Sequence, residues 1–230
     1  MWDVIKSKRE IIKLFDKFID TYGDRYPECT LEMILDEFYE KLGSYETYDI
    51  VQQIYTELEI WDKEDDIYYN HFKKVKENFD INSNILDLCS GRIPSFANTI
   101  AKHQLKIGNG TITCYDPRLI YNNKYSNMTL YRKEFNEQVD ISNFDLITGL
   151  YTCEASETII RQSIKNDKDF YIALCGCNHF DYSCEEGAYQ EYLVDYANDL
   201  FTKYGQGKLC IDYIDEKFGM PAPILYNKRK

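Results

Sequence analysis

The segment Asn84-Ile85-Leu86-Asp87-Leu88-Cys89-Ser90-Gly91 is the most informative part of the sequence about the fold. A short apolar run that closes in a Ser-Gly pair is typical of a buried strand followed by a tight turn. The next segment, 95–103, has helical character, so we expect a strand, a turn and a helix in succession. Downstream, β-rich segments alternate with helical ones. The β-rich segments are 111–116, 128–135, 144–150 and 170–175, and the later helices are 154–165 and 183–204.

This alternation predicts a parallel sheet that is covered by helices on both faces. Two final β-rich segments, 208–214 and 224–226, are separated by a short loop and predict an antiparallel hairpin at one edge. Ligands of such sheets bind at the carboxyl ends of the strands. We therefore expect a site at the turn that contains Gly91 and at Asp116, which ends the second strand. A carboxylate there can accept hydrogen bonds from both hydroxyls of a ribose, which indicates a nucleoside cofactor.

The first third of the chain reads as helix throughout. Apolar residues recur largely at three- and four-residue intervals in four segments, which are 5–19, 31–42, 48–61 and 65–79. We expect residues 1–80 to form a helical cap domain and residues 81–230 to form the α/β domain. Such apolar stripes favour packing faces, and a lid that selects the substrate is the functional alternative.

Charge is distributed unevenly along the chain. The 230 residues include 39 acidic and 27 basic side chains, for a net charge of −12, and 44% of the residues are hydrophobic. Residues 1–80 hold 20 of the acidic and 11 of the basic side chains, which is three quarters of the excess. The acidity argues against a broad nucleic-acid-binding surface. The acidic helices are instead candidates for docking a basic partner.

The longest purely apolar run, 170–175, has six residues and is far shorter than the roughly 20 that a membrane-spanning helix needs. The first residues also lack the pattern of a secretion signal. We therefore expect a soluble, cytoplasmic protein without a membrane partner.

Residues 86–91 resemble the first motif of the class I S-adenosylmethionine-dependent methyltransferases, whose usual form is an apolar residue, Asp, any residue, and then Gly at every second position. Tyr115-Asp116 is similar to their ribose-binding second motif, and 144–147 resembles their fourth strand. The resemblance covers 84–230. It implies a Rossmann-like methyltransferase fold, with a mostly parallel seven-stranded sheet and a C-terminal antiparallel hairpin, and S-adenosylmethionine as cofactor.

The same resemblance implies the residues that hold the cofactor. Asp87 would fix the glycine turn and, through water, the methionine moiety, and Asn136 would lie against the adenine amine. The full implied set is Asp87, Leu88, Cys89, Ser90, Gly91, Asp116, Pro117, Asn136, Gly149 and Leu150.

Two further segments, 149–154 and 173–179, are similar in layout to a subset that includes some tRNA ribose methyltransferases. They supply three catalytic candidates, Tyr151, Glu154 and His179. A carboxylate or a phenol near the methyl group helps to remove the proton of an oxygen or nitrogen acceptor. Glu154 can equally serve as favourable charge at a helix N-terminus, and His179 can be structural. The acceptor, whether small molecule, protein or RNA, stays open.

The glycine turn departs from the family pattern. Its first glycine is Cys89 and its third is Ile93, so that Gly91 alone remains. This loss argues against a nicotinamide dinucleotide, whose pyrophosphate requires the glycines. It leaves open a second interpretation, in which the domain has lost catalysis and serves as a binding or regulatory module.

The eight cysteines are expected to be reduced thiols, because the chain is long and lacks a secretion signal. The nearest approach to a metal pattern is Cys175-x-Cys177-x-His179, with Cys184 beyond it. Because no Cys-x-x-Cys pair occurs, we expect no metal site.

Overall fold

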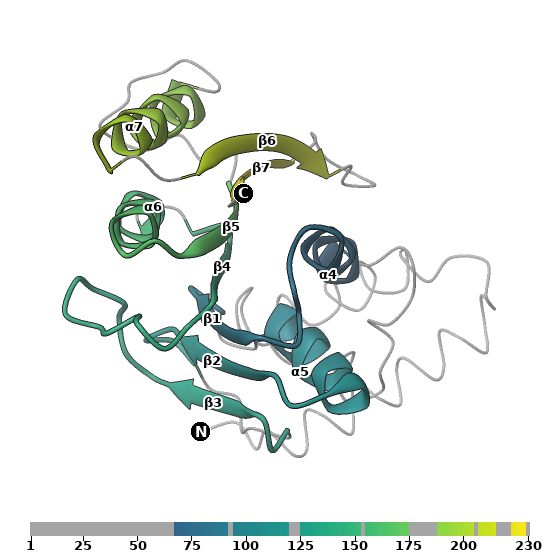
Figure 1. Ribbon diagram of the computed structural model, residues 1–230. Helices are drawn as coiled ribbons and strands as arrows, with labels where there is room; N and C mark the ends of the chain where they lie inside the picture. The colour runs from purple at the N-terminus through teal and green to yellow at the C-terminus, as the bar shows by residue number, and fades with distance from the viewer. Residues whose placement is uncertain are drawn as a thin grey trace, which may run out of the picture. The chain divides into compact units, whose positions relative to one another are not determined.

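Seven strands form one sheet in the order β3-β2-β1-β4-β5-β7-β6 (Figure 1). The computed structural model describes residues 67–91, 94–119, 125–152, 155–174, 188–204, 207–214 and 222–228. The strands are β1 Asn84–Leu88, β2 Thr111–Tyr115, β3 Met128–Tyr131, β4 Leu146–Leu150, β5 Asp169–Ala173, β6 Lys208–Ile214 and β7 Ala222–Lys228. The first five pair in parallel, whereas β7 pairs antiparallel with both β5 and β6. The predicted parallel sheet with an antiparallel C-terminal hairpin is confirmed.

Helices cover both faces of this sheet. The described helices are α4 Ile67–Asn78, α5 Ser95–Ile107, α6 Ser156–Lys165 and α7 Ala188–Tyr204. Figure 1 shows α4 and α5 on one face, with α6 and α7 on the other. Each pair of helices packs against its own cluster of buried apolar residues from the strands. None of the described helices is long and apolar enough to cross a bilayer.

The central strands are buried along almost their whole length, which explains their continuous apolar sequences. All five residues of β4 are buried, as are four of the five residues in each of β1 and β5. The more peripheral β2 buries only alternate residues. A strand with helices on both faces must present apolar side chains in both directions, whereas a strand near the edge need not.

Helix α4 belongs to this packed core, although it lies within the N-terminal region that we expected to form a cap. Phe72 and Val75 are 2% and 0% exposed and join the cluster beneath α5. The ring of Phe72 stacks on His103 of α5 with centroids 4.2 Å apart. The 12 residues of α4 match the fourth predicted helix. The other three predicted helices lie outside the described residues, and the division at residue 80 stays a prediction.

Candidate functional site

The turn between β1 and α5 keeps the backbone conformation of a glycine turn. Cys89 has φ 56° and Gly91 has φ 76°, both in the left-handed region. The Cys89 N–H donates to the carbonyl of Tyr115 at 2.9 Å, and the Ser90 hydroxyl donates to the carbonyl of Asp87 at 3.0 Å. A side chain in this region costs roughly 1–2 kcal/mol. Cys89 therefore adopts the left-handed backbone conformation that glycine favours, although the family's glycine at this position is replaced by cysteine.

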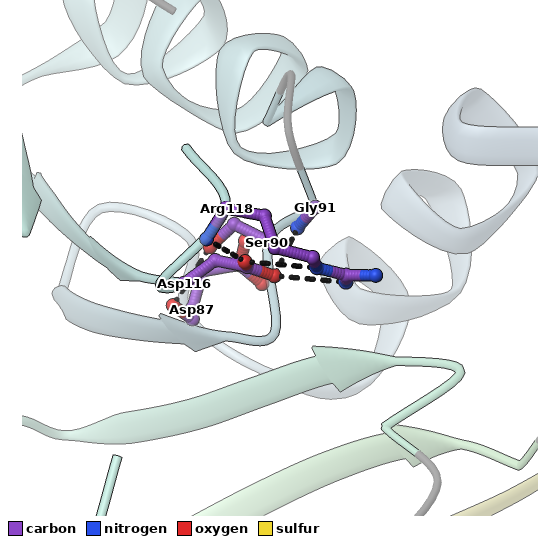
Figure 2. A network of polar contacts seen from close by, with 5 residues as sticks. All are labelled: Asp87, Ser90, Gly91, Asp116 and Arg118. Atoms are coloured by element: carbon purple, nitrogen blue, oxygen red, sulfur yellow. Dashed lines mark hydrogen bonds and ion pairs between the residues drawn. The ribbon is translucent and has the colours of Figure 1, made fainter. Parts of the chain in front are cut away.

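Asp116 joins this turn to the end of β2. Its side chain is 2% exposed, and its Oδ2 accepts the N–H of Gly91 at 2.9 Å (Figure 2). The two sequence motifs are 25 residues apart and meet through this hydrogen bond. The carboxylate lies at the carboxyl end of the parallel strands, where ligands of such sheets bind.

Arg118 also binds this carboxylate, and the sequence analysis missed it. Its backbone N–H donates to Oδ1 of Asp116 at 2.7 Å, its Nε donates to Oδ1 at 3.2 Å, and its Nη2 donates to Oδ2 at 3.2 Å. The side chain of Arg118 is 68% exposed. Arg118 follows directly after Asp116 and Pro117, the two residues that the sequence predicts at this site, so its position along the chain was the available signal. Pro117 is exposed.

Asp87 is buried beneath the turn, with 2% of its surface exposed. Its Oδ1 accepts the hydroxyl of Thr148 in β4 at 2.8 Å. Burial raises the pKa of Asp87 to about 7, and the nearby charge of Asp116 adds to the rise, whereas hydrogen bonds from Thr148 and Ser90 oppose it. Thr148 is a second partner that the sequence analysis did not select.

This raised pKa makes stability depend on pH in a defined direction. The folded chain holds the proton of Asp87 up to about pH 7, whereas the unfolded chain releases it near the ordinary pKa of 3.8. The contribution of Asp87 to stability is therefore lost as the pH rises between these values. Asp87→Asn removes the titration. We expect the variant to gain on the order of 3 kcal/mol relative to the original chain between about pH 4.5 and pH 8.

Urea denaturation at several pH values measures this difference. Asp140→Asn is the matched control, because a backbone hydrogen bond from Ser142 lowers the pKa of that exposed carboxyl. The stability of Asp140→Asn relative to the original chain should change little with pH, and in the direction opposite to that of Asp87→Asn. A difference for Asp87→Asn that does not vary with pH would contradict the assignment.

The remaining cofactor candidates near β1 and β4 lie in the packed core. Leu88 and Leu150 are 0% and 9% exposed and pack within the two core clusters. A Cβ placed on Gly149 would lie 2.4 Å from Cγ2 of Thr152 and 3.1 Å from the carbonyl oxygen of Leu88. Close packing of β4 therefore accounts for glycine at this position.

Asn136 lies on the exposed loop after β3. Its Oδ1 accepts the backbone N–H of Gln138 at 2.9 Å, which forms a local turn. Because a carbonyl oxygen has two lone pairs, this bond leaves one acceptor position on the amide. A contact with an adenine amine stays a prediction.

Tyr151 follows β4 directly and has φ 56°. Its hydroxyl lies 3.4 Å from Nε2 of His71, and Nδ1 of His71 lies 2.8 Å from the hydroxyl of Tyr171 in β5. His71 and Tyr171 are both 0% exposed. Burial lowers the pKa of His71 to about 3, so the imidazole is neutral and has one donor and one acceptor nitrogen for its two neighbours.

The sequence analysis did not select His71, since it reads only as one residue of an amphipathic helix. The other two catalytic candidates, Glu154 and His179, lie outside the described residues. The same holds for Cys175, Cys177 and Cys184. Among the residues that are described, no three His, Cys, Asp or Glu side chains group in a way that could hold a metal ion.

Cys89 is half-buried and unsuited to nucleophilic chemistry. Burial raises the pKa of its thiol to about 12, and the charges of Asp116 and Asp87 act in the same direction. A thiol reacts as its thiolate, which is scarce at neutral pH when the pKa is this high. Within the described part of the chain, Cys89, Cys114 and Cys210 are free thiols.

Comparison with known proteins gives similarity at the level of structure. The sequence matches no family model and no curated protein. Fibrillarin from Methanococcus jannaschii is 14% identical with a TM-score of 0.45, and the similarity covers 64% of this chain and 66% of that one. A methyltransferase from Pyrococcus furiosus is 14% identical with a TM-score of 0.47, covering 79% and 98%. A methyltransferase from Aquifex aeolicus, described as dependent on S-adenosylmethionine, is 12% identical with a TM-score of 0.45, covering 75% and 96%.

The fold itself follows from the strand order and directions. Five parallel strands in the order β3-β2-β1-β4-β5 continue into an antiparallel β7 and then β6. The glycine turn follows β1, and the acidic residue follows β2, as the sequence motifs require. The chain has the Rossmann-like fold of the class I S-adenosylmethionine-dependent methyltransferases.

Proposed function

We propose that the protein is an S-adenosylmethionine-dependent methyltransferase that acts on an acceptor still to be identified. The observation that carries the proposal is the 2.9 Å hydrogen bond from the Gly91 N–H to the Asp116 carboxylate. It brings the glycine turn after β1 and the acidic residue after β2 to one point. This juxtaposition at the carboxyl ends of parallel strands suits a nucleoside.

The residues present fit such a cofactor. A ribose offers two neighbouring hydroxyl donors, and Asp116 offers two carboxylate oxygens at the end of β2. A methyl donor carries no phosphate, so the turn does not need the glycines that a pyrophosphate requires. The chain would therefore hold the ribose through Asp116 and the rest of the cofactor along the turn at 87–91.

When bound, S-adenosylmethionine supplies an electrophilic methyl group on a sulfonium. The protein must hold the acceptor in line with that carbon at about 3 Å, and such positioning provides most of the rate enhancement. Tyr151, Glu154 and His179 are proposed to take up or direct the proton that an oxygen or nitrogen acceptor loses. His71 would orient the Tyr151 hydroxyl through the 3.4 Å contact between them.

Calorimetric titration tests the proposal. The full chain should bind both S-adenosylmethionine and S-adenosylhomocysteine with dissociation constants in the micromolar range. Nicotinamide adenine dinucleotide serves as the comparison ligand and should not bind. The proposal is wrong if neither of the first two ligands gives heat of binding at high micromolar concentration. Circular dichroism of the same sample must show that it is folded.

A second candidate function is a methyltransferase-like binding module without catalysis. It is favoured by the Arg118 side chain, which already occupies the carboxylate expected to receive the ribose. Incubation of cell extract with the protein and tritium-labelled S-adenosylmethionine separates the two. A labelled product supports the enzyme, whereas cofactor binding without any labelled product supports the module.

A further inference from the structure

The Asp116 carboxylate has no free acceptor position among its described contacts. An ionised carboxylate offers about four lone-pair sites. Oδ1 accepts the backbone N–H and the Nε of Arg118, and Oδ2 accepts the backbone N–H of Gly91 and the Nη2 of Arg118. Figure 2 shows the guanidinium extended along the carboxylate, with both oxygens engaged.

These four donors are of two kinds. Two are backbone N–H groups whose positions are set by the turn after β1 and by the turn after β2. The other two belong to the guanidinium of Arg118, whose side chain is 68% exposed, whereas that of Asp116 is 2% exposed. Because most of the Arg118 side chain is exposed, the guanidinium is the donor group that can move, whereas the carboxylate is held in the core.

A ribose diol also presents two donors side by side. To bind the Asp116 carboxylate, the diol needs two lone-pair sites. The Arg118 guanidinium, which can move, holds two such sites. We propose that Arg118 competes with the ribose for Asp116, so that a nucleoside binds only when its two hydroxyls replace the two guanidinium N–H groups. This inference rests on the proposed function.

The exchange makes Arg118 a residue that sets the affinity of the site. A ligand with both hydroxyls restores both hydrogen bonds that it displaces. A ligand with one hydroxyl leaves a site unfilled after the guanidinium departs, and an unsatisfied charged acceptor is costly. The Asp116 carboxylate therefore favours a ribonucleoside with an intact diol over its deoxy analogue, and Arg118 lowers the affinity for both.

Titration of the full chain with S-adenosylhomocysteine tests the competition. Arg118→Ala keeps the backbone N–H and removes the guanidinium, so we expect binding about fivefold tighter, the scale of an exposed bidentate ion pair. Arg132→Ala, at another exposed arginine, is the matched control and should leave affinity unchanged. Discrimination between adenosine and 2′-deoxyadenosine should be the same in R118A as in the original chain, because both ligands displace the same guanidinium.

Salt provides an independent readout. Because added salt screens an exposed ion pair, affinity of the original chain for S-adenosylhomocysteine should rise about twofold to threefold between low and high sodium chloride. Affinity of Arg118→Ala should not change. A ligand that is held by charge would instead lose affinity as the salt concentration rises.

Three other outcomes overturn the competition. Equal affinities of Arg118→Ala and the original chain would show that the guanidinium leaves at no cost. Weaker binding by Arg118→Ala would show that Arg118 contacts the ligand, and in both cases the proposed function stands. No binding by either protein would overturn the proposed function together with the competition.

Discussion

Asp116→Asn is expected to weaken the binding of S-adenosylhomocysteine by about 100-fold. The amide keeps one acceptor oxygen but turns the other position into an NH₂ donor, which faces the Gly91 N–H or the ribose instead of accepting from them. Hydrogen bonds to a charged group contribute about 1.5–3 kcal/mol each. Weakening two of them corresponds to roughly two orders of magnitude in the dissociation constant.

Calorimetry on the folded variant measures this loss. Asp195→Asn, at an exposed position of α7, makes the same chemical change away from the turn and should bind as the original chain does. The thermal unfolding midpoint of Asp116→Asn should be recorded beside its affinity, since the turn also loses a charge-assisted bond. An affinity within threefold of the original chain would contradict the assignment of Asp116 to the ribose.

His71→Phe is expected to destabilise the folded chain at neutral pH. The phenyl ring preserves the aromatic packing against Phe96, Tyr151 and Tyr171. It cannot bond the Tyr171 hydroxyl, whose oxygen lies 2.8 Å from Nδ1 of His71 in the interior. A buried hydroxyl that loses its partner costs about 1–3 kcal/mol, so we expect a loss of about 2 kcal/mol at pH 7.5.

The loss should disappear as the pH falls. The pKa of His71 is about 3 in the folded chain, below the ordinary value of 6.5, so the unfolded chain binds the proton first on acidification. The original chain therefore loses about 2 kcal/mol from this residue between pH 7.5 and pH 5, and the variant does not. The two proteins should have about equal stability near pH 5.

Urea denaturation at pH 5, 6 and 7.5 follows the difference. His103→Phe makes the same substitution at the half-buried ring that stacks on Phe72, outside the contact between His71 and Tyr171. A difference between the original chain and His71→Phe that stays constant over this range would mean that the pKa of His71 is not lowered in the folded protein.

The strands and the position of the glycine turn could be predicted because both depend on local pattern. β1, β4 and β5 read as mainly apolar segments, since helices cover both of their faces. Gly91 marks the turn by the conformation it permits, and Asp116 follows the next strand directly. Chain order then places the two residues at the same edge of the sheet.

The partners of these residues could not be predicted in the same way. Thr148 and Asp87 are 61 positions apart, and Tyr171 and His71 are 100 positions apart. Periodicity reports which face of an element is buried, but it does not report which polar groups meet there. Burial then changes their chemistry, raising the pKa of Asp87 to about 7 and lowering that of His71 to about 3.

The parallel sheet and the turn at Gly91 can be read from the amino-acid sequence, because apolar periodicity and a Ser-Gly pair after an apolar run are local signals. The contacts of Arg118 with Asp116, and of His71 with Tyr151 and Tyr171, arise only when the chain is folded. These contacts depend on the direction in which each side chain leaves its element and on the water that burial excludes. The spacing of residues along the chain predicts neither the side-chain direction nor the exclusion of water.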